Sequence, residues 1–147
     1  MDYITNDDIE TRLGSDRYIQ LTDDSGSGSA NTDVLDEARL GAEREVDSYL
    51  ARRYAVPIDL AANSELAALM ATVVLDLVEY RLHVRRPPVP ADVVDKREAA
   101  IKWLGQVASG AVELPSAAAL SANPATGLRA ATTGDARVLS RDELSDV

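Results

Sequence analysis

The segment LTDDSGSGSANTDVLDEA carries oxygen-bearing side chains at spacings that resemble a calcium-binding loop. An EF-hand loop needs oxygen ligands at positions 1, 3, 5 and 12 and a glycine at position 6, because a hard divalent cation binds several carboxylates. With Gly28 at position 6, Asp23, Ser25 and Ser27 fall at positions 1, 3 and 5, but Val34 falls at position 12. Because the bidentate carboxylate is missing, the Ser/Gly composition predicts a flexible linker that binds no calcium.

The single histidine and one pair of carboxylates are the other candidates for chemistry. His83 has no cysteine and no second histidine with which to share a metal, so it is predicted as a surface or helix-end residue with satisfied hydrogen bonds. Asp76 and Glu79 lie three residues apart on one helix face, which suits acid–base catalysis by paired carboxylates. Nearby arginines instead predict ordinary ion pairs for both, namely Arg81, Arg85 and Arg86. No catalytic, cofactor-binding or metal-binding residue is predicted, and no cofactor.

The charge distribution disfavours nucleic-acid binding. The formal net charge is −10, and residues 1–62 hold 14 acidic against 6 basic side chains. A protein that grips phosphates needs clustered Lys or Arg, so the acidic half predicts either a surface that DNA passes without binding or simply a soluble surface. Arg52 and Arg53 form a basic spot with Arg85 and Arg86 only if two helix ends meet, and arginines in an acidic chain are more often rim ion pairs.

The composition predicts a soluble protein made in a cytoplasm. The longest apolar run, residues 66–75, ends at Asp76 and falls well short of the ~20 residues that a membrane-spanning helix needs. The acidic opening MDYITNDDIE lacks the apolar region of a signal peptide. The chain has no cysteine, so no disulfide framework is expected.

Capping residues and apolar periodicity predict an all-α fold, a small bundle of about four helices. The first helix begins after Thr5, which offers a capping hydroxyl, and ends near Gly14, after which residues 15–21 add one more turn. After a loop at 22–31, three longer helices are predicted at 31–55, 65–86 and 91–110, with Gly110 as a left-handed cap of the last.

The helix predicted at 65–86 is apolar on nearly every side, so it must be buried on nearly every side. Only two other long helices are expected in the bundle, and they would leave part of this surface uncovered. Contacts between subunits are therefore assigned to this helix, through Val74, Leu75, Val78 and Leu82.

Residues 115–147 differ in character from the helical domain predicted at 1–114. They contain no aromatic residue and show no sustained periodicity, so they are predicted to form an extended C-terminal arm that becomes ordered only on a partner. Two stretches supply apolar anchors for such docking, the first with Leu120 and Leu128 and the second with Val138 and Leu139.

Three stretches together resemble a known family: EVDSYLARRYAVP, YRLH and KWLGQVASG. With the opening YITNDDIETRLGSDRYIQLTDD and the small-residue loop that follows, they are similar to the head-to-tail adaptor family of Mu-like tailed phages. The resemblance runs from Tyr3 to about Leu114 and leaves the segment from 115 onward uncovered.

The resemblance implies a non-enzymatic subunit of the virion neck that is assembled in the host cytoplasm. Twelve neighbouring copies would form a ring under the portal protein and extend the DNA channel toward a stopper or tail protein, with DNA passing through unbound and no membrane involved. By analogy with related adaptors, the C-terminal arm would clasp the portal. The open alternatives are another neck component, such as a stopper or tail-completion protein, and a non-viral acidic helical module that binds a protein partner.

Overall fold

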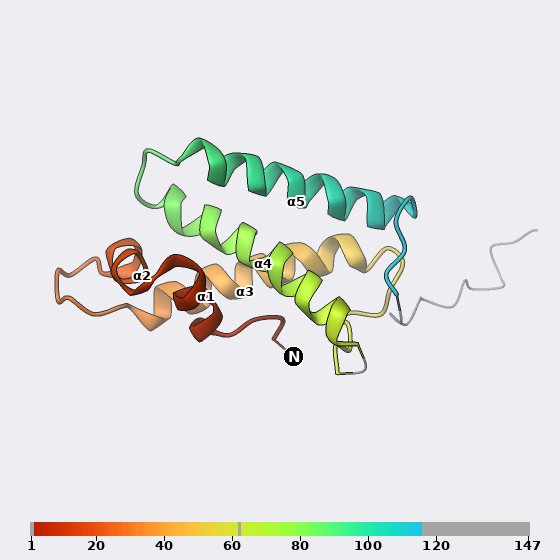
Figure 1. Ribbon diagram of the computed structural model, residues 1–147, viewed down its shortest axis with the longest axis horizontal. Coiled ribbons are helices and arrows are strands. Elements are labelled where there is room, and N and C mark those ends of the chain that lie inside the picture. Colours follow the sequence, from red (N-terminus) through yellow and green to blue (C-terminus); the bar gives the residue numbers. More distant parts are fainter. Residues whose placement is uncertain (1, 62, 116–147) are drawn as a thin grey trace, which may run out of the picture.

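The computed structural model describes residues 2–61 and 63–115, and this part of the chain is helical without any strand (Figure 1). It contains five helices: α1 (Asn6–Leu13), α2 (Ser15–Thr22), α3 (Thr32–Leu50), α4 (Ser64–Val84) and α5 (Ala91–Ser109). The predicted all-α class is confirmed. The antiparallel α3, α4 and α5 form the body of the molecule, and the two short helices pack beside α3 and α4.

Local signals in the sequence set most helix boundaries. Thr5 and Asp8 form a capping box at the start of α1, and the Asn31 side chain accepts hydrogen bonds from the first turn of α3. Gly110 adopts the predicted left-handed conformation after α5, with φ 85°. Gly14, with φ 80°, breaks the chain so sharply that the turn predicted after it becomes a separate eight-residue helix, α2.

Helix α4 is the centre of the fold, because it contacts all four other helices (Figure 1). The side chains of Val74, Val78 and Leu82 are fully buried within the chain, and Leu75 is half-buried. The expectation that the bundle leaves these residues uncovered therefore needs correction. The reason is that α1 and α2 cover the part of α4 that α3 and α5 do not reach.

Both ends of the described chain are held against the bundle by hydrogen bonds. The Tyr3 amide donates to Glu43 on α3 (2.9 Å), and the Tyr3 hydroxyl donates to Asp47. At the other end, the Leu114 amide donates to the Tyr54 hydroxyl (3.0 Å). These contacts hold the segment before α1 against α3, and the segment after α5 against the turn that follows α3.

The Ser/Gly loop between α2 and α3 is organised by the carboxylate of Asp23. Its two oxygens accept hydrogen bonds from the amides of Gly28 (2.7 Å) and Ser25 (3.0 Å). Arg86 donates to the Asp23 carbonyl (2.7 Å), which ties the loop to the end of α4. The loop therefore has defined local contacts that its composition did not predict. The absence of calcium binding stays a prediction from the sequence.

The Asp23 hydrogen bonds lead to a prediction about acid stability. Backbone donation, chiefly from Gly28, holds the pKa of Asp23 well below its usual value. A group whose pKa is lowered on folding stabilises the fold above its unfolded pKa, and this contribution is lost as the pH falls below about 4. The free energy of unfolding should therefore decline less steeply below pH 4 in Asp23→Asn than in the unmodified protein, as measured by urea denaturation.

Asp95→Asn is the matched control, because the exposed Asp95 has no hydrogen-bond or ion-pair partner among residues 2–61 and 63–115. It should reproduce the acid profile of the unmodified protein. Identical profiles for Asp23→Asn and Asp95→Asn would contradict the role given to Asp23.

Candidate functional site

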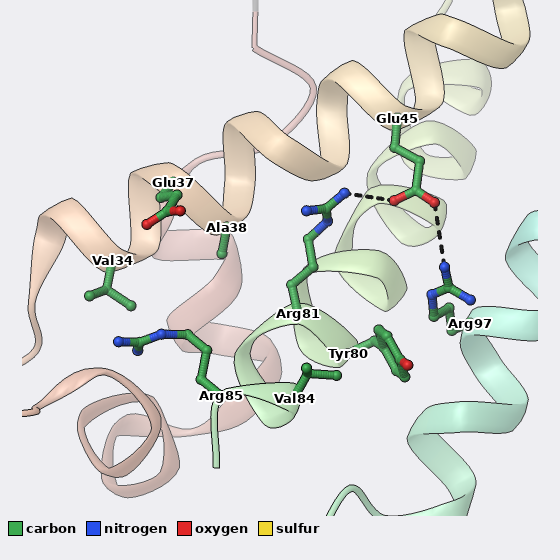
Figure 2. A pocket seen from close by; sticks show the side chains of 9 residues that line it. All are labelled: Val34, Glu37, Ala38, Glu45, Tyr80, Arg81, Val84, Arg85 and Arg97. Atoms are coloured by element: carbon green, nitrogen blue, oxygen red, sulfur yellow. Dashed lines mark hydrogen bonds and ion pairs between the residues drawn. The ribbon is translucent and has the colours of Figure 1, made fainter. Parts of the chain in front are cut away.

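A groove of about 440 Å³ lies where α3, α4 and α5 meet (Figure 2). Its walls combine charged and apolar side chains: Val34, Glu37, Ala38 and Glu45 from α3, Tyr80, Arg81 and Val84 from α4, Arg97 from α5, and Arg85 just after α4. Its side chains converge from segments far apart in the sequence.

The carboxylate of Glu45 joins the three long helices at one end of the groove. It lies 2.8 Å from Arg81 on α4 and 3.6 Å from Arg97 on α5, so two guanidinium groups share one carboxylate (Figure 2). The Arg97 guanidinium also stacks over the Tyr80 ring, 4.6 Å from its centroid. This end of the groove therefore carries an excess of positive charge.

Gly41 makes room for the arginine at the centre of this arrangement. A Cβ atom at Gly41 would lie 2.8 Å from Nη1 of Arg81. Glycine inside a helix costs about 1 kcal/mol relative to alanine, and here its lack of a side chain lets Arg81 lie flat against α3. At the groove, this glycine is the local sequence feature that indicates the close approach of the Arg81 side chain to α3.

The other end of the groove is more apolar. Val34 and Ala38 face it from α3, and Val84 remains 48% exposed at the end of α4 (Figure 2). Arg85, at the same end, donates to Asp24 of the Ser/Gly loop (2.6 Å). An apolar strip beside charged side chains can hold an apolar residue of a protein partner.

The shared carboxylate gives a measurable contribution to stability. Glu45→Gln leaves Arg81 and Arg97 without their counter-charge, so we expect a loss of about 1 kcal/mol in the free energy of unfolding, smaller at high salt. Chemical denaturation at low and high salt measures it. Glu98→Gln, at an exposed α5 carboxylate that has no ion pair in the described ranges, should change nothing. Equal stabilities for the two variants would refute the assigned role.

The two carboxylates considered for catalysis are structural ion pairs, with partners that differ from the predicted ones. Asp76 lies 2.6 Å from Arg12 on α1, and Glu79 lies 3.4 Å from Lys96 on α5. The ion-pair interpretation is right, but the partners come from neighbouring helices and not from Arg81, Arg85 or Arg86. Burial raises the pKa of Asp76, and Arg12 opposes this effect.

The four arginines considered as a basic spot do not meet. Because α3 and α4 are antiparallel, the end of α3 and the end of α4 lie at opposite ends of the bundle (Figure 1). Arg85 and Arg86 pair with Asp24, and Arg53 pairs with Glu113. Within the described residues, three of the four arginines therefore form the expected rim ion pairs.

His83 lies at the end of α4, as predicted, but it is not at the surface. It is only 4% exposed, and its Nε2 atom is buried without a hydrogen-bond partner in the described part of the molecule. Burial lowers the pKa of His83, and the nearby Arg17 lowers it further. Residues of α2 and of the proline-rich turn after α4 lie beside the ring, and neither segment is part of the helix that carries His83.

The other predicted site residues fall into two groups. Val74, Val78 and Leu82 belong to the core of the subunit, which leaves the half-buried Leu75 as the one assigned interface residue with accessible surface. The anchors proposed for the C-terminal arm lie outside the described residues: Leu120, Leu128, Val138 and Leu139. Within residues 2–61 and 63–115, no three metal-ligating side chains converge, and none of the helices there is long and apolar enough to cross a bilayer.

Within residues 2–61 and 63–115, these observations define a small all-α protein with a mixed polar and apolar groove on its surface. The chain belongs to the family described as Bacteriophage Mu, Gp36, whose model matches residues 3–132. No curated protein gives a significant match. Family membership makes it a structural or assembly protein of a Mu-like phage. The match extends past Leu114, where the resemblance had been expected to end.

Proposed function

We propose that the chain is the head-to-tail adaptor subunit of its phage, one copy in a ring of twelve beneath the portal protein. The observation that carries the proposal is the family match over residues 3–132, which covers the helical body and part of the segment after it. In this role the protein catalyses no reaction and binds no cofactor. It assembles in the host cytoplasm and then forms part of the virion neck.

The charge distribution supports a position around the DNA path. Residues 1–62 carry a balance of −8, from 14 acidic and 6 basic side chains. A ring with this half toward its lumen repels phosphate, so DNA passes through without adhering. A stopper or tail protein would then bind the side of the ring that faces away from the portal.

Contacts between copies use apolar side chains that the subunit leaves accessible. Leu40 on α3 and Leu69 on α4 are 38% and 40% exposed, and Leu75 is half-buried. A closed ring needs two different complementary surfaces on each copy, and these residues lie on two different helices. Leu40, Leu69 and Leu75 therefore take the place of the α4 valines as proposed contact residues, because those valines are buried within the subunit.

Negative-stain electron microscopy of necks made with a tagged copy tests the proposal. Tag density in a twelve-fold ring directly below the portal is the expected result, and purified portal should capture the protein. Tag density at the tail side of an existing ring would instead identify a stopper or tail-completion protein. A tag absent from purified particles would contradict a virion role.

A further inference from the structure

A second hollow, of about 180 Å³, lies where α2 meets the end of α4 and the turn that follows it. Its lining is rich in hydrogen-bond donors and contains no acidic side chain: Arg17, Gln20 and Leu21 from α2, His83 from α4, and Arg86, Pro88 and Pro90 from the turn. In a chain with a net charge of −10, a cationic hollow of this kind needs an explanation.

The positive charge on its wall is only partly neutralised. Arg86 donates to the carbonyl of Asp23 (2.7 Å) and to the carboxylate of Asp24 (3.0 Å). Arg17 is exposed and forms no ion pair or hydrogen bond with any residue in the described ranges. One guanidinium group is therefore available to an anion that enters the hollow.

The buried histidine supplies the second observation. His83 is 96% buried, and Nε2 has neither solvent contact nor a hydrogen-bond partner within the described residues. A buried polar atom left unpaired loses its hydrogen bonds to water without replacement, so natural structures rarely keep one without a reason. The His83 ring and the unpaired Arg17 guanidinium line the same small hollow, so a carboxylate bound to Arg17 would lie beside the imidazole.

We propose that this hollow binds a single carboxylate, presented by an Asp or Glu side chain of a partner protein, with the Arg17 guanidinium as its main donor and the His83 imidazole beside it. The Gln20 amide, which also lines the hollow, offers a further donor. A carboxylate accepts several hydrogen bonds on two oxygens, and charge-assisted bonds of this kind are the strong ones. The inference does not depend on the proposed adaptor role.

The surroundings favour a carboxylate over the phosphates of a nucleic acid. Asp16 precedes Arg17 in the sequence, and the Asp24 carboxylate accepts a hydrogen bond from the neighbouring Arg86, so acidic side chains lie close to the lining residues. A polyanion would meet these carboxylates and the rest of the acidic half of the chain. A single side-chain carboxylate enters with one charge and avoids most of this repulsion.

Binding should be coupled to protonation of His83. A carboxylate beside the ring favours the charged imidazolium, and Glu79 and Asp92 act in the same direction, whereas Arg17 and Lys96 oppose it. Arg86, on the wall of the hollow, also opposes it. A carboxylate ligand should therefore bind more tightly as the pH falls through the titration range of the histidine.

Because the chain contains one histidine, its imidazole signals in ¹H–¹⁵N NMR spectra report on the hollow without overlap. The full chain is titrated with acetate to about 0.1 M at constant ionic strength. We expect a saturable shift of the His83 signals and a titration midpoint that moves to higher pH. Arg17→Gln should weaken acetate binding roughly tenfold, because it removes a charge-assisted donor.

Arg44→Gln is the matched control, because Arg44 is another exposed arginine without an ion pair in the described residues but lies on α3, outside the lining of the hollow. It should bind acetate like the unmodified protein. A response that does not saturate, or equal affinities in Arg17→Gln and Arg44→Gln, would overturn the proposal. Saturation by inorganic phosphate or a short DNA duplex, with no response to acetate, would overturn it in favour of a phosphate site.

Discussion

Replacing Val78 by aspartate is expected to unfold the subunit before any effect on assembly can be measured. Val78 is fully buried in the middle of α4, the helix that all four others contact. An aspartate there buries a charge without a partner, which costs at least about 4 kcal/mol. A domain of this kind is stable by only about 5–15 kcal/mol. Circular dichroism during urea denaturation should show a large loss of stability or no folded state.

Two control variants distinguish the cost of a buried charge from that of a cavity, and the effect of a core position from that of a surface position. Val78→Ala removes only methyl groups and should cost about 2 kcal/mol. Leu69→Asp places the same charge on the same helix at a side chain that is 40% exposed, so stability should change by less than about 0.5 kcal/mol. If Val78→Asp were as stable as Leu69→Asp, the conclusion that Val78 is buried within the subunit would be wrong.

The same pair of variants distinguishes folding from ring formation. Under the proposed adaptor role, Leu69→Asp gives a folded subunit that fails to form rings, as seen by size-exclusion chromatography and electron microscopy. Val78→Asp cannot give this result, because the folded subunit is itself lost. Normal rings from Leu69→Asp would remove Leu69 from the proposed contacts between copies.

Sequence reasoning works well here wherever the determining interaction is local. Thr5 and Asn31 cap helices through bonds to residues two or three positions away, and Gly110 ends α5 through its own backbone conformation. The apolar periodicity that predicts α3 also matches its packing, since Leu35 and Val46 are fully buried. Each of these predictions needs only the few residues that surround it.

The errors arise where the partner is distant in the sequence. Asp76 was paired with arginines on its own helix, but Arg12 is 64 residues away and reaches it because α1 packs on α4. His83 is buried for a similar reason, since α2 covers it. The groove could not be predicted, because nothing local shows that Glu45, Arg81 and Arg97 converge from three helices.

Removing residues 116–147 is expected to leave the helical body intact and to abolish portal binding. The described chain ends with its own contacts, because Leu114 donates to Tyr54 and the Pro115 carbonyl accepts from Asn63 (3.4 Å). A cut after Pro115 preserves both, so the unfolding temperature should change by less than about 2 °C. The removed segment has no aromatic residue and only scattered Leu and Val, so it adds little to a core.

The family match further divides this segment, because it ends at residue 132. Leu120 and Leu128 lie inside the matched region, whereas Val138 and Leu139 lie beyond it. If portal binding is a property shared across the family, its anchors belong to the matched part. Replacing Leu120 and Leu128 together by aspartate should therefore abolish capture by immobilised portal, and the same change at Val138 and Leu139 should weaken it far less. A truncated protein that still joins tails to filled heads would show that the helical body alone makes the attachment.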